Sequence, residues 1–95
     1  MEYLFDLGLT LEEINNLKSK CSSSDIEKLE FFPRLVKENY NCLKGYGISN
    51  IKTCFINHVK MFFMNPDKFR SIFNKYDRAD LVRCIEKNDA VLEKL

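Results

Sequence analysis

Apolar residues recur along this chain at the spacing of an α-helix, in segments separated by polar helix-start residues, glycines and prolines. The clearest segment carries apolar residues at relative positions 0, 3, 4, 8 and 11, namely Ile51, Cys54, Phe55, Val59 and Phe62. Residues at these spacings lie on one face of a helix, and that face has to be buried against another element. Strand patterns are nearly absent. The sequence therefore predicts an all-α fold.

Local capping signals predict where the helices begin. Thr10 and Glu13 have the spacing of a capping box and predict a helix over Leu11–Lys20. Ser24 and Glu27 have the same spacing and predict a second box before a short helix. Further starts are predicted at Pro33, Ser49, Asn65–Pro66 and Asp77, with a last turn from Asp89 and helix ends at Gly45 and Gly47. We expect a small domain of five to six short helices over residues 1–95.

The composition supports one folded core. Hydrophobic residues make up 45% of the 95 residues and charged residues 31%, with a formal net charge of +1. This balance excludes disorder caused by low hydrophobicity and high net charge. Eight phenylalanines and four tyrosines, with no tryptophan, predict a phenylalanine-rich core.

The cysteines and the single histidine do not have the spacing of a metal site. Cys21, Cys42, Cys54 and Cys84 include no C-x-x-C pair, so we expect free core thiols. Cys54 and His58 are one helical turn apart, and we expect His58 to be partly buried beside core residues rather than catalytic or metal-binding. The sequence therefore predicts a non-enzymatic protein without a cofactor, a metal or a small-molecule substrate.

The first residues lack both a cationic segment and a long apolar run. This pattern is not that of a signal peptide or a membrane-spanning helix, so no membrane partner is expected. A reducing cytoplasmic location suits four unpaired thiols.

Two self-similarities indicate a repeat of stacked helical units. At an offset of 30 residues, Tyr46 aligns with Tyr76, Ile51 with Leu81, Cys54 with Cys84 and Phe55 with Ile85. A period of this length suits two stacked units that bury each other's apolar faces. An apolar-Gly-apolar-hydroxyl element also occurs twice, at 7–10 and at 46–49. In each copy the glycine is expected to take a left-handed turn, and the hydroxyl to cap the next helix.

These elements, together with the stretches 31–49 and 62–76, resemble the repeats of the mitochondrial transcription termination factor family. In that family a Leu-x-x-x-Gly-Leu-Ser-type element joins a helix, a proline and another helix. Pro33 matches the repeat proline, whereas Val59 stands near the place of the next one. The resemblance covers about two repeats and implies a short arc of a half-ring that holds duplex nucleic acid.

That resemblance makes nucleic acid one candidate partner. Residues 49–95 carry nine basic and six acidic side chains, whereas residues 1–48 carry six and eight. The candidate phosphate contacts are chosen by charge and location rather than by a family motif: Lys52, Lys60, Lys68, Arg70, Lys75, Arg78 and Arg83. The alternative is that these side chains belong to ordinary solvated helix faces.

The four consecutive large apolar residues Met61, Phe62, Phe63 and Met64 provide the other candidate. They cover every side of a helical turn, so a single buried stripe cannot enclose them all. Either they are buried between two layers of the domain, or they form an exposed edge for self-association or a partner helix. The sequence favours a helical binding module with a protein partner or a second copy, with nucleic-acid binding as the alternative.

Overall fold

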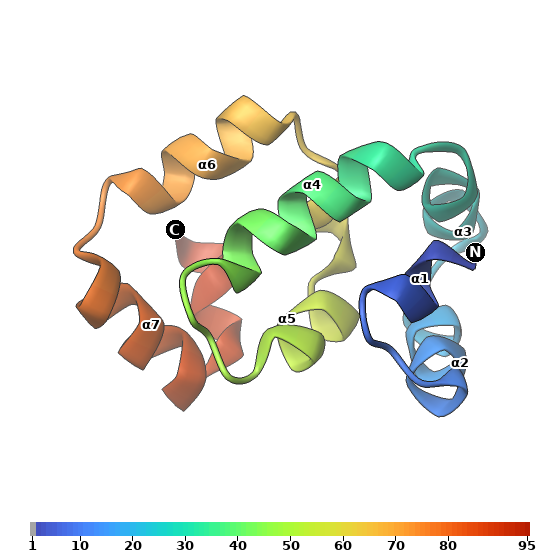
Figure 1. Ribbon diagram of the computed structural model, residues 1–95, viewed down its shortest axis with the longest axis horizontal. Coiled ribbons are helices and arrows are strands. Elements are labelled where there is room, and N and C mark those ends of the chain that lie inside the picture. Colours follow the sequence, from blue (N-terminus) through green and yellow to red (C-terminus); the bar gives the residue numbers. More distant parts are fainter. Residues whose placement is uncertain (1) are drawn as a thin grey trace.

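The computed structural model describes residues 2–95, which form seven α-helices and two 3₁₀ helices and contain no strand (Figure 1). The helices are α1 (Tyr3–Asp6), α2 (Leu11–Lys20), α3 (Ser23–Phe31), α4 (Pro33–Lys44), α5 (Ile51–Asn57), η1 (Val59–Phe63), α6 (Pro66–Asn74), α7 (Arg78–Lys87) and η2 (Asp89–Lys94). The prediction of an all-α fold is confirmed. The helices are shorter and more numerous than expected, because one predicted helix is interrupted and the N-terminal residues form a turn of their own.

Three helix starts lie where the capping signals predict them. The Thr10 hydroxyl accepts a hydrogen bond from the Glu13 N–H at 3.1 Å, and the Glu13 carboxylate accepts one from the Thr10 N–H at 2.8 Å. The Asn65 side chain accepts from the Asp67 N–H at 2.9 Å, and Asp77 caps α7 through its carboxylate. These bonds supply acceptors for N–H groups that have no partner within their own helix.

Two predicted starts are wrong. The second capping box is formed by Ser22 and Asp25, not by Ser24, so α3 begins earlier than expected. Each partner accepts a hydrogen bond of 3.2 Å from the backbone N–H of the other. Ser49 does not cap α5. Its N–H instead donates to the Glu86 carboxylate at 2.8 Å, a contact that no local pattern encodes.

The two glycine elements adopt the predicted turn. Gly8 and Gly47 have φ values of +98° and +86°, in the left-handed region that favours glycine. The hydrophobic residues that follow them, Leu9 and Ile48, are both buried. The glycine therefore reverses the chain while the next side chain seals the turn against the core.

The helix predicted over residues 51–62 is interrupted at His58. Here α5 ends, the backbone takes φ −131° and ψ 40°, and the chain continues as η1. The side-chain amide of the fully buried Asn39 donates to the carbonyls of Phe62 at 2.9 Å and Met64 at 2.8 Å. Because a side chain on α4 satisfies these carbonyls, the chain can leave η1 at Met64 without a further helical turn.

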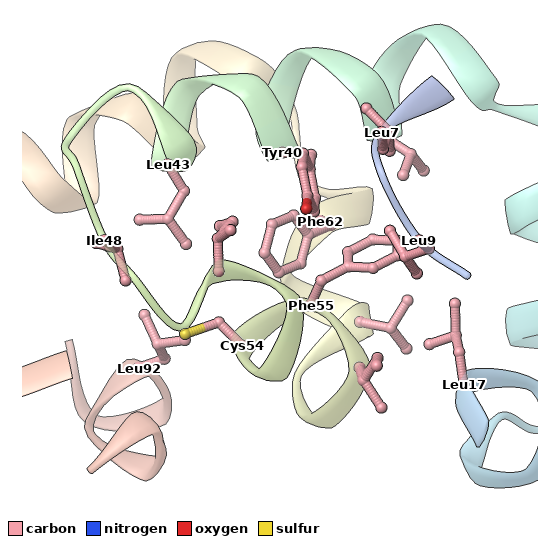
Figure 2. Packing of buried hydrophobic residues seen from close by; sticks show 14 of the residues in the cluster. Leu7, Leu9, Leu17, Tyr40, Leu43, Ile48, Cys54, Phe55, Phe62 and Leu92 are labelled. Carbon is pink, nitrogen blue, oxygen red and sulfur yellow. The ribbon is translucent and has the colours of Figure 1, made fainter. Parts of the chain in front are cut away.

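A row of aromatic rings forms the centre of the core, which confirms the predicted phenylalanine-rich interior. Successive ring centroids lie 5.3, 5.0, 5.4 and 4.9 Å apart along the series Tyr40, Phe55, Phe62, Phe69 and Phe73. Three of these four pairs have the edge-to-face geometry that aromatic quadrupoles favour, and the Phe62–Phe69 pair is tilted. Figure 2 shows the first three of these rings meeting between α4, α5 and η1.

Helix α4 organises the packing. It lies across α5 and η1 and also contacts α3 and α6, while α2 packs on α5 and α7 packs on α6 and η2 (Figure 1). The Tyr3 hydroxyl donates to the Leu29 carbonyl at 2.6 Å and so joins α1 to α3. Burial raises the pKa of Tyr3 to about 12. None of the helices within residues 2–95 is long and apolar enough to cross a bilayer.

The cysteines are unpaired but do not all lie in the core. Cys54 is fully buried and Cys21 and Cys42 are partly buried, whereas Cys84 is exposed, contrary to prediction. The buried residues of α7 are Leu81 and Ile85. Consecutive residues of a helix point roughly 100° apart, so Cys84, which directly precedes Ile85, faces away from the core. Burial raises the pKa of the Cys54 thiol to about 12, so this group is not a thiolate at neutral pH.

Candidate functional site

The predicted apolar surface at residues 61–64 lies on η1 and its end, and most of it is covered. Phe62 has no exposed surface and belongs to the aromatic row, so it cannot contact a partner while the core is closed. Met61, Phe63 and Met64 are partly buried and pack against the core. The Lys28 ammonium lies 5.7 Å from the centroid of the Phe63 ring. Burial between elements therefore describes Phe62, and the other three offer only a partly exposed edge.

The predicted phosphate contacts do not all remain free. Lys52 forms an ion pair with the Glu13 carboxylate at 3.4 Å. Hydrogen bonds from Thr10 and the nearby Lys52 charge lower the pKa of Glu13. The Lys52 ammonium is thus already opposite a carboxylate that is ionised at neutral pH.

Two of the arginines are also occupied. The Arg78 guanidinium lies 4.9 Å from the centroid of the Tyr46 ring, within the range of a cation–π contact. Arg83 forms an ion pair with Asp80 on the same helix. The remaining four basic residues are exposed and form no ion pair within residues 2–95: Lys60, Lys68, Arg70 and Lys75.

The most exposed aromatic ring lies elsewhere, at the junction of α3 and α4, next to a second exposed ring. The side chains of Phe31 and Phe32 are 73% and 51% exposed. With Pro33, Leu35 and Pro66 they line a hollow of about 380 Å³, and we call these five residues the aromatic corner. A single residue separates the two helices, so two adjacent rings cannot both turn toward one core. No local pattern marks the two rings as exposed, because Pro33 restricts only the backbone of the residue before it.

A second hollow of about 420 Å³ adjoins the aromatic corner along the exposed face of α4. Its lining residues recur at helical spacing and are Pro33, Arg34, Lys37, Glu38 and Asn41. The aliphatic stems of arginine and lysine provide apolar wall while their charged ends stay in water. We call this region the α4 hollow. It shares Pro33 with the aromatic corner, and Arg34 and Glu38 line both hollows, so the two hollows form one continuous surface.

A polar cluster around His58 is the third feature that the structure brings together. The His58 Nε2 lies 2.8 Å from an Asp89 oxygen, and Nδ1 lies 3.2 Å from a Glu93 oxygen. The Asn57 amide also donates to Asp89 at 3.1 Å, and the Lys20 ammonium donates to the Asn57 oxygen at 2.7 Å. The His58 side chain is only 8% exposed, as the expected partial burial requires. The acidic partners were missed because they lie more than thirty residues along the chain.

The geometry of the His58 cluster suits a structural contact. The two carboxylates bind opposite ring nitrogens and do not converge on one point, and residues 2–95 contain no group of His, Cys, Asp and Glu arranged for a metal ion. The His58 imidazole makes no hydrogen bond to the Cys54 thiol among the described contacts, and the two residues are joined only through the His58 N–H and the Cys54 carbonyl at 3.0 Å. Both ring nitrogens can donate to carboxylates only when the imidazole is protonated. The cluster joins the start of η1 to η2.

No family model, curated protein or solved structure matches this chain. Its function is therefore inferred from its own surface. Of the three regions, the His58 cluster is satisfied by internal contacts, and the edge at residues 61–64 is largely covered. The aromatic corner alone combines two highly exposed rings with an adjoining hollow.

Proposed function

We propose that this chain is a non-enzymatic helical interaction module whose protein partner packs on the aromatic corner. The observation that carries this proposal is the exposure of Phe31 and Phe32 beside a hollow of about 380 Å³. Covering a phenylalanine side chain contributes about 1.5–3 kcal/mol. A partner that covers both rings therefore gains a substantial part of its binding free energy at this one place.

Contiguity favours the corner over the other exposed apolar residues. The other exposed large apolar side chains are Phe5, Leu11 and Tyr76, at 51%, 62% and 43%, and they come from α1, α2 and the segment between α6 and α7. Single exposed hydrophobic residues are normal on protein surfaces, whereas contiguous apolar patches mark interaction sites. Phe31 and Phe32 are neighbours and border the same hollow.

Selection of random peptides displayed on phage against the full chain tests this proposal. We expect the selected peptides to carry large apolar anchor residues and to bind Phe31→Asp at least tenfold more weakly than the unmodified protein. Phe5→Asp is the matched control, because it places the same charge at another exposed phenylalanine. Selected peptides that bind Phe31→Asp and the unmodified chain equally well would contradict the proposal.

Nucleic-acid binding is the second candidate, and the exposed basic residues of α6 favour it. Lys68 and Arg70 lie on this helix, Lys75 follows its end, and all three are exposed without an ion pair within the described chain. A charge reversal at all three positions should abolish an electrophoretic shift of duplex or single-stranded probes at low salt. No shift with the unmodified protein at low salt would remove this candidate.

A further inference from the structure

The exposed face of α4 carries opposite charges one helical turn apart. Arg34 and Glu38 are both exposed, and neither forms an ion pair within residues 2–95. Such a pair is self-complementary. When two copies of the helix lie antiparallel about a twofold axis between these positions, each arginine faces the glutamate of the other copy.

The same register brings the two hollows of each copy to the contact. An axis at the level of position 36 relates Arg34 of one copy to Glu38 of the other, and both residues line the α4 hollow of about 420 Å³ and the hollow beside Phe31 and Phe32. The stems of Arg34 and Lys37 provide apolar wall there. The Phe31 ring, which is 73% exposed, therefore borders the contact.

We infer that the partner of the aromatic corner is a second copy of this chain, packed antiparallel along α4. This inference rests on the proposed function, because it uses the same exposed rings. Twofold symmetry places each Arg34 opposite Glu38 of the other copy. The contact involves little more than one helix face of each copy. Standard interfaces bury about 800 Å² per partner, so we expect a weak dimer that forms only at high protein concentration.

Sedimentation of the full chain at increasing concentration, in a buffer of physiological salt, tests the second copy. We expect a monomer–dimer equilibrium. Arg34→Glu and Glu38→Arg should each weaken association about tenfold or more, because like charges would then face each other across the axis. The double variant Arg34→Glu/Glu38→Arg reverses both partners together and should associate within about threefold of the unmodified protein.

Lys18→Glu is the matched control for net charge, since it makes the same change as Arg34→Glu at an exposed position on α2. It should leave the association unchanged. A chain that stays monomeric at every concentration would overturn the second-copy inference. So would a dimer whose dissociation constant is the same for the unmodified protein and for all three α4 variants. Neither result contradicts the proposed function. That proposal fails only if the selected peptides bind Phe31→Asp and the unmodified chain with equal affinity.

Discussion

Two pairs of adjacent phenylalanines end in different surroundings in this molecule. Phe62 and Phe63 lie on η1, where the first ring is fully enclosed and the second is partly buried. Phe31 ends α3 and Phe32 links it to α4, and the two side chains keep 73% and 51% of their surface in water. Both pairs end a helix, so residue type and local position do not distinguish them.

The difference lies in polar contacts from distant parts of the chain. The buried pair is held at both ends of η1. Asn39 binds the carbonyls of Phe62 and Met64, and His58 joins the start of η1 to two carboxylates of η2. The exposed pair instead occupies a junction that leaves one residue between two helices. We infer that the burial of an aromatic pair depends on the side chains that hold its backbone in place. Variants at four places in the molecule test this inference.

The largest effect is expected for Phe62→Ala, which should lower the free energy of unfolding by about 3–5 kcal/mol. The ring is fully enclosed, and its removal leaves a cavity within the aromatic row. Urea denaturation measures the change. Phe63→Ala serves as the adjacent control and should cost clearly less, because its ring is only partly buried. Equal losses for the two variants would remove the distinction between them.

Asn39→Asp should lower the free energy of unfolding by about 2–3 kcal/mol at neutral pH. The substitution replaces an amide that donates to two carbonyls by a carboxylate that can only accept. Protonation restores a donor, so the loss should shrink in acid. Asn15→Asp makes the same substitution at an exposed position and should have little effect. A variant as stable as the unmodified chain at neutral pH would show that Asn39 does not hold η1.

Asp89→Asn tests the other end of η1 and should cost about 1 kcal/mol at pH 7. The Asn57 hydrogen bond and the His58 contact lower the pKa of Asp89. A carboxyl with a lowered folded-state pKa stabilises the protein above its unfolded pKa, and this contribution is lost as the pH falls below about 4. Urea denaturation between pH 7 and pH 2 should therefore give a shallower acid decline for the variant. Parallel pH profiles would mean that the contact contributes nothing.

The smallest effect on stability is expected at the aromatic corner. Phe31→Ser/Phe32→Ser should change the free energy of unfolding by less than about 1 kcal/mol, because both rings are largely solvated already. The same variant should elute markedly earlier from a hydrophobic interaction column. A loss comparable to that of Phe62→Ala would show that the corner is covered in solution.

The sequence predicted those features that depend on neighbours along the chain. The caps at Thr10, Asn65 and Asp77 bind backbone groups two or three residues away, so their spacing alone reveals them. The left-handed turns at Gly8 and Gly47 are local in the same sense. The all-α class and the phenylalanine-rich core follow from these signals and from the helical period.

Features that depend on distant contacts could not be predicted. The interruption at His58 coincides with contacts to Asp89 and Glu93, more than thirty residues away. The burial of Phe62 accompanies an amide on α4, which lies 23 residues earlier. For the same reason the sequence favoured an interaction surface at residues 61–64, whereas the fold leaves Phe31 and Phe32 exposed.

The short connection between α3 and α4 determines how the aromatic corner meets a partner. One residue links the two helices, and Pro33 fixes its own φ at the start of α4. The backbone beneath both rings is therefore preorganised before any encounter. Docking there loses little conformational entropy, so even a small contact area can be used efficiently.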